Sequence, residues 1–100
     1  MWRRVPAKVA EQRLAQYYYR NACLRYPDPE RQAAEGYTSY KKGYEIRFVA
    51  YNPQEAHEII ALLREAGFGY GRPFKKRRRT VIPVYGREAV DLFLALLTRT

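Results

Sequence analysis

The chain has 100 residues, the length of one domain, and 47% of them are hydrophobic, which is enough to fill a single modest core. Its 19 lysines and arginines outnumber 10 acids, giving a net charge of +9, and no apolar run reaches the ~20 residues that a transmembrane helix needs. One cysteine, Cys23, excludes an internal disulfide and a cysteine zinc site, and we expect its thiol to be buried and inert. These features favour an intracellular, cytoplasmic protein that stays out of membranes.

The N-terminal segment, residues 1–27, predicts a helix over about 6–26. Its apolar residues form a stripe: Val9, Leu14, Tyr17, Tyr18, Ala22 and Leu24. Pro27 ends this helix, because proline restricts the residue before it and lacks a backbone donor. Asp28 then caps a short helical piece that runs to Glu35.

A hairpin of strands over 37–41 and 44–51 follows, because both segments are rich in residues that favour strands. In the second strand, alternation places Arg47 on one face and an apolar set on the other: Tyr44, Ile46 and Phe48.

The clearest helix comes next. Asn52 is a good N-cap, Pro53 suits the first helical position, and Glu55 stands where a capping box needs an acid. Gly67 is expected to end the helix in the left-handed conformation.

A second hairpin is predicted from a weak strand over 68–74, a turn over 75–79 and a return strand over 80–85. Pro83 is in tension with this strand, because proline lacks the donor that a central strand needs. A last helix begins at about Gly86.

The predicted fold is a single α+β domain over 1–100, with two strand-strand-helix units over 37–66 and 68–97 after the N-terminal helix. Two hairpins then form an antiparallel sheet with helices on one face. The other face is left free, and Arg47 should lie on it.

This α-ββα-ββα order resembles one half of a LAGLIDADG homing endonuclease, and two segments carry the similarity. Residues 34–48, AEGYTSYKKGYEIRF, are similar to the end of the name motif running into its first hairpin, and residues 84–90, VYGREAV, to the last strand and helix. The resemblance implies a sheet laid along DNA, a homodimer, and a metal-binding acid at Glu35. The small apolar start of the motif is replaced by charged residues at 28–32, so the name motif is degenerate.

The run 72–79 holds six cations and no acid: Arg72, Lys75, Lys76, Arg77, Arg78 and Arg79. At a hairpin tip it suits the phosphates of DNA or RNA, although such runs also occur as solvated loops or nuclear-import signals. Lys41, Lys42 and Arg47 extend this patch if the two hairpins are adjacent. We therefore predict a non-catalytic nucleic-acid-binding module that needs no cofactor and no metal.

Two other functions remain open. The basic surface also suits an acidic protein partner, anchored by the tyrosines at 17–19, of which at least one must point away from the core. A divalent-metal nuclease would be built on Glu35, beside which no second acid is fixed. His57 lacks paired ligands and is predicted to be a surface residue.

Overall fold

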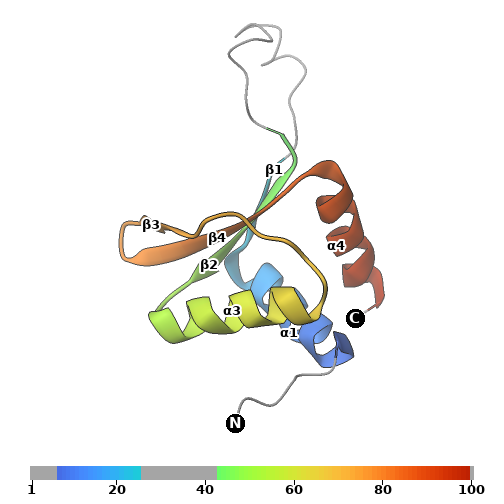
Figure 1. The fold of residues 1–100 in the computed structure, drawn as a ribbon, viewed down its shortest axis with the longest axis horizontal. Coiled ribbons are helices and arrows are strands. Elements are labelled where there is room, and N and C mark those ends of the chain that lie inside the picture. Colours follow the sequence, from blue (N-terminus) through green and yellow to red (C-terminus); the bar gives the residue numbers. More distant parts are fainter. Residues whose placement is uncertain (1–6, 26–42, 100) are drawn as a thin grey trace, which may run out of the picture.

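The computed structural model describes residues 7–25 and 43–99, and these ranges form one small α+β domain (Figure 1). Its helices are α1 (Ala7–Asn21), α3 (Pro53–Glu65) and α4 (Arg87–Arg99). Its strands are β1 (Cys23–Arg25), β2 (Glu45–Ala50), β3 (Phe74–Lys76) and β4 (Arg79–Tyr85). The strands form one antiparallel sheet in the order β1-β2-β4-β3. The predicted fold class is confirmed.

The core lies between the sheet and the helices. Alternate residues of the two central strands face it: Ile46, Phe48, Ala50, Ile82 and Val84. All three helices of the described ranges contribute buried residues to the same cluster, among them Leu14, Ile59, Leu63, Val90 and Phe93. Because neighbouring strand residues point to opposite faces, Arg47 lies on the face away from this core, as predicted.

The end of the first helix differs from the prediction. α1 ends at Asn21, and the next residues, which were expected to be helical, form β1. They pair with Glu45–Arg47 of β2, which satisfies backbone groups along that edge of the strand. This long-range pairing outweighs local helix propensity. Leu24 consequently lies opposite Ile46 in the sheet rather than on a helical stripe.

Several predicted features lie outside the described residues. They are the short helix over 28–35 with Glu35, the strand over 37–41, and the two lysines Lys41 and Lys42. Within the described ranges, the strand that pairs with Glu45–Arg47 opposite β4 is β1.

The second hairpin turns more tightly than predicted. Of the expected strand over 68–74 only Phe74 belongs to β3, because glycine and proline interrupt the earlier part. The turn consists of Arg77 and Arg78 alone, and the other residues of the predicted turn are paired in strands. Arg77 has a φ of 59°, in the left-handed region that two-residue hairpin turns require and that favours glycine.

Pro83 lies within β4 without breaking the ladder to β2. In an antiparallel strand, the N–H and C=O of one residue point to the same side. The Pro83 carbonyl accepts a hydrogen bond from the Gly71 N–H at 2.8 Å, on the flank beyond the end of β3. The missing donor of Pro83 therefore faces this flank, so β4 is locally an edge strand where the proline stands.

Candidate nucleic-acid interface

The buried residues of the described helices cluster with one face of the sheet, which carries Ile46, Phe48, Ala50, Ile82 and Val84, and we call the opposite face the open face. The pairing register assigns to it the residues in line with Arg47: Cys23, Arg25, Glu45, Val49, Phe74, Lys76, Arg79, Val81, Pro83 and Tyr85. Val81 and Pro83 are buried at its centre, whereas Phe74 and Tyr85 are exposed. The face thus combines aromatic rings with cations.

Charge is divided unevenly between the helices and the sheet. The three described helices together carry six lysines or arginines and six acids, so their net charge is zero. Many of these charges pair with one another: Arg13 with Glu58, Arg20 with Glu55, Arg87 with Asp91, and Arg99 with Glu11. Outside the helices the described residues hold eight cations and one acid, Glu45, a net charge of +7. Within the described residues, the excess positive charge therefore belongs to the strands and the segments that connect them to the helices.

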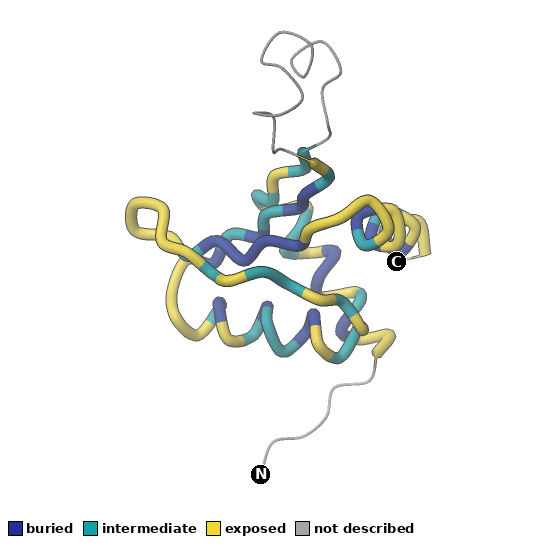
Figure 2. Tube along the Cα trace, turned by 45° about the horizontal axis from the view of Figure 1, so that its top comes forward, coloured by how far each residue is buried: buried dark blue, intermediate teal, exposed yellow. Residues whose placement is uncertain are grey.

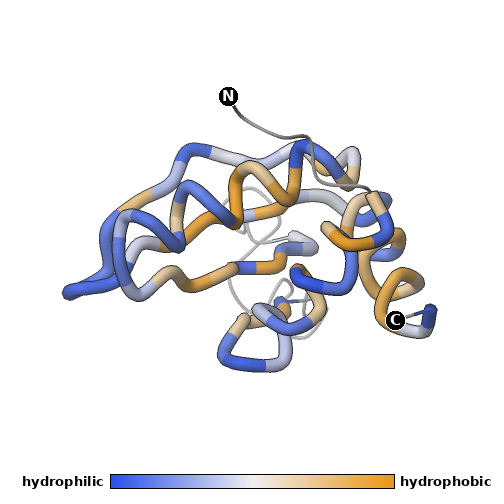
Figure 3. Tube along the Cα trace, turned by 90° about the horizontal axis from the view of Figure 1, so that it is seen from below, coloured by the Kyte–Doolittle hydropathy of each residue, from blue (hydrophilic) through white to orange (hydrophobic). Residues whose placement is uncertain are grey.

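Five of these cations form the hairpin tip, which we define as residues 75–79. All five are exposed, and in the described part of the chain none of them pairs with a carboxylate. Figure 2 shows the tip as an exposed loop extending from the body, and Figure 3 shows it as a strongly hydrophilic point. Arg72, also exposed, precedes β3. The predicted basic residues of this hairpin are thus brought together.

Arg47 is placed as predicted but is less available than the hairpin cations. Its Nε lies 3.0 Å from Oε2 of Glu45, and its guanidinium carbon lies 5.5 Å from the centroid of the Phe74 ring. Its side chain is 25% exposed. Neither Arg47 Nε nor Glu45 Oε2 makes a hydrogen bond of good geometry. We therefore regard Arg47 chiefly as a support for Phe74 and a partner of Glu45.

A stack of two arginines on one tyrosine joins the helices to the hairpin. The guanidinium carbons of Arg20 and Arg79 lie 3.8 and 3.7 Å from the centroid of the Tyr51 ring. Two guanidinium groups this close to one centroid would overlap on the same side, so they cover opposite faces of the ring. Each contact is a cation–π interaction. The stack fixes Arg79 at the base of the hairpin tip, and sequence reasoning missed it.

Glu55 holds the helical end of this stack. Its two carboxylate oxygens accept hydrogen bonds from Arg20 at 2.9 and 3.0 Å, and Oε1 also accepts the Tyr51 N–H at 2.8 Å. The capping box is thus shifted by one residue, since Asn52 caps the Glu55 N–H as predicted while Glu55 reaches back past Asn52. The hydrogen bonds from Arg20, and then from Tyr51, hold the pKa of Glu55 below its ordinary value.

We expect Glu55→Gln to lower the free energy of unfolding by about 1–2 kcal/mol at pH 7, because it removes a charge-assisted contact. A carboxylate with a lowered native pKa stabilises the fold above its unfolded pKa, and this contribution is lost as the pH falls through the native pKa. The difference between the variant and the wild type should therefore shrink below about pH 4.3. Urea unfolding from pH 7 to pH 3 measures it. Asp91→Asn, at an exposed pair, should change stability by less than about 0.5 kcal/mol.

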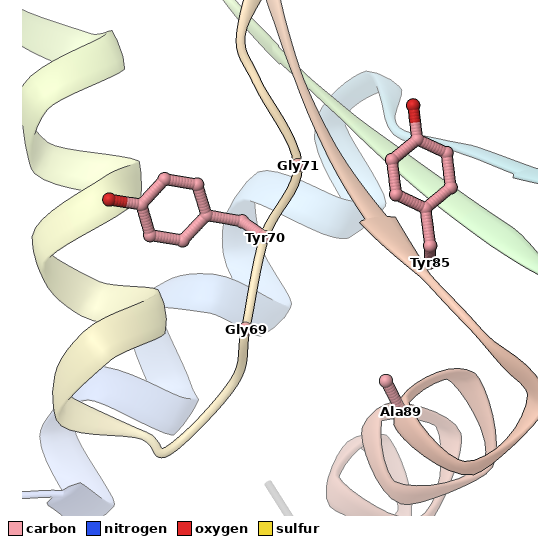
Figure 4. A pocket seen from close by; sticks show the side chains of 5 residues that line it. All are labelled: Gly69, Tyr70, Gly71, Tyr85 and Ala89. Atoms are coloured by element: carbon pink, nitrogen blue, oxygen red, sulfur yellow. The ribbon is translucent and has the colours of Figure 1, made fainter.

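A shallow depression of about 240 Å³ opens beside Tyr85 (Figure 4). Its lining consists of Gly69, Tyr70, Gly71, Tyr85 and Ala89. Tyr70 points toward α3, whereas Tyr85 lies on the other side of the 69–71 segment. A Cβ atom on Gly71 would lie 2.3 Å from Cε2 of Tyr85, so this glycine lets the ring rest against the backbone.

The remaining sequence candidates are placed as follows. Tyr17 and Tyr18 pack against the core, and Tyr19 is the ring that points away, with 70% exposure. His57 is exposed, as predicted. Cys23 is also exposed, so the expectation of a buried thiol was wrong; it assumed a helical residue, whereas Cys23 lies at the edge of the sheet opposite Arg47.

Two kinds of feature are absent from the described residues: a cluster of metal ligands and a membrane-spanning helix. No three His, Cys, Asp or Glu side chains within 7–25 and 43–99 gather as metal ligands. No helix in the same ranges is long and apolar enough to cross a membrane.

Comparison with known proteins gives no relative: no protein-family model, curated protein or solved structure matches this chain.

Proposed function

We propose that this protein is a non-catalytic nucleic-acid-binding module that uses the hairpin tip and the open face. The observation that carries the proposal is the division of charge: a net charge of zero on the helices and +7 on the rest of the described chain. A charge that only kept the protein in solution would not need this separation, whereas a surface for a polyanion does.

The hairpin tip suits phosphates in a further respect. Its cations have no carboxylate partner in the described ranges, so binding to phosphate breaks no ion pair. Each neutralised phosphate releases condensed counterions, which gives binding energy and a dependence on salt. The resemblance to a LAGLIDADG half supports the same mode, in which a sheet face lies on the nucleic acid.

Fluorescence anisotropy with duplex DNA, single-stranded DNA and structured RNA, at several salt concentrations, tests the proposal. We expect a Kd in the micromolar range or tighter for at least one of them at physiological salt. Equally weak binding to all three, lost as salt rises, would overturn the proposal. We would then infer that the basic surface binds an acidic protein partner, with exposed Tyr19 as an anchor.

The single cysteine makes the position of the interface measurable. Cys23 is exposed on the open face, so bound nucleic acid should slow its alkylation by iodoacetamide several-fold. In the control Cys23→Ser/Leu92→Cys the thiol moves to an exposed position on α4, and its alkylation rate should not change. Equal protection of both thiols, or no protection of Cys23, would argue against the open face.

A further inference from the structure

We propose that the bound nucleic acid is single-stranded, and that Phe74 and Tyr85 stack on its unpaired bases. The inference rests on the proposed function and specifies its substrate. Phe74 is 36% exposed and Tyr85 is 57% exposed, and both lie on the open face. Exposed rings beside cations are the usual means by which proteins hold unpaired bases.

Each ring is held in place by its neighbours. The guanidinium of Arg47 lies 5.5 Å from the Phe74 centroid. The Tyr85 ring rests against Gly71, and the depression of about 240 Å³ leaves open space beside it. A ring held in this way loses little conformational freedom when a base stacks on it. Tyr51 is different, because two arginines already cover both of its faces.

The position of the rings gives the bound strand a path. Phe74 pairs with Val81, and Tyr85 lies four residues farther along β4, or about 13 Å at the usual rise of a strand. This distance equals about four nucleotides at a stacked spacing of 3.4 Å. Beyond Phe74 the same line reaches the hairpin tip, first at Lys76. The rings thus hold bases at one end of the path, and the cations hold phosphates at the other.

A duplex fits this surface less well. Its bases are already paired and stacked inside the helix, so the two rings would face phosphates and sugars. The hairpin tip alone would still attract a duplex through its charge. Stacking therefore predicts a preference for single strands, whereas charge alone predicts none.

The test compares Phe74→Ala, Tyr85→Ala and the double variant with Tyr19→Ala, which removes an exposed ring from α1. Binding is measured by anisotropy with single-stranded DNA, RNA of the same sequence, and the corresponding DNA duplex. We expect each open-face variant to weaken single-strand binding roughly 10-fold and duplex binding less than about 3-fold. The slope of log K against log salt should stay unchanged, and Phe74→Tyr and Tyr85→Phe should keep wild-type affinity.

Each outcome separates the inference from the proposed function. If the wild type binds duplex as tightly as single strands and the alanine variants match it, the stacking inference fails while nucleic-acid binding stands. If the wild type binds none of the three, the proposed function itself fails. A loss in Tyr19→Ala equal to that in the open-face variants would also overturn the inference. Comparing single-stranded DNA with RNA shows whether the protein prefers deoxyribose or ribose. Weaker binding of the double variant to either strand supports stacking.

Discussion

Replacing Lys76, Arg77 and Arg78 by glutamine is expected to weaken single-strand binding roughly 50-fold at 0.15 M salt, with the slope of log K against log salt falling by about 2. The estimate takes three lost phosphate contacts, each contributing about 0.7 to the slope. These side chains are exposed and, among the described residues, have no acidic partner. Arg79 is left unchanged because it stacks on Tyr51. Salt titrations of the variant and the wild type by anisotropy measure both quantities.

The matched control removes the same charge from the helices. Lys8, Arg13 and Arg99 lie on α1 and α4 and contact none of the residues that line the depression beside Tyr85, and replacing them by glutamine also lowers the net charge by three. Affinity in this variant should stay within about threefold of the wild type, because distant charges are screened over about 8 Å at physiological salt. Equal losses in the two variants would show that net charge, and not the hairpin tip, governs binding.

Truncating Phe93 to alanine should lower the free energy of unfolding by about 3–5 kcal/mol, more than Glu55→Gln does. Its fully buried ring lies between three others, with centroids 5.5 Å from Tyr18, 5.3 Å from Phe48 and 5.7 Å from Phe68. One side chain thus joins α1, β2, α4 and the segment after α3. Folded domains of this size are stable by about 5–15 kcal/mol, so the variant retains only a marginal fold.

Urea unfolding followed by circular dichroism measures this loss. Leu92→Ala is the control, because Leu92 is the neighbouring residue of α4 but is 57% exposed, and its truncation should change stability by less than about 0.5 kcal/mol. Phe93→Leu should fall between the two, since leucine refills part of the space. A loss below about 1 kcal/mol in Phe93→Ala would contradict the aromatic centre described for this core.

Features encoded by neighbouring residues were predictable from the sequence. Asn52 and Gly67 mark the ends of α3 through their own side-chain and backbone chemistry, and both act as expected. Alternation within β2 correctly put Arg47 on the free face, because strand periodicity is local as well. The basic residues of the second hairpin were also grouped correctly, since they are consecutive.

Features that depend on distant pairings were not predictable. Nothing local distinguishes Cys23–Arg25 from a continuing helix, because their strand conformation depends on pairing with β2 some twenty residues later. The stack of Arg20, Tyr51 and Arg79 needs three segments to be brought together, and no spacing in the sequence indicates it. Pro83 conflicts with a central strand when only the sequence is considered. Whether its missing N–H faces a partner strand depends on where β3 ends, which is a property of the folded sheet.

If the proposed function holds, the separation of charge should also affect how the molecule approaches a nucleic acid. A neutral helix layer beside a positive sheet gives the folded chain a permanent electric dipole. In the field of a polyanion such a dipole turns before contact, so collisions occur with the hairpin leading. Association should therefore be faster than the ordinary 10⁵–10⁶ M⁻¹s⁻¹ at low ionic strength and should slow as salt shortens the range of the field. We therefore expect the sheet to act on the rate of encounter with a nucleic acid as well as on the lifetime of the complex.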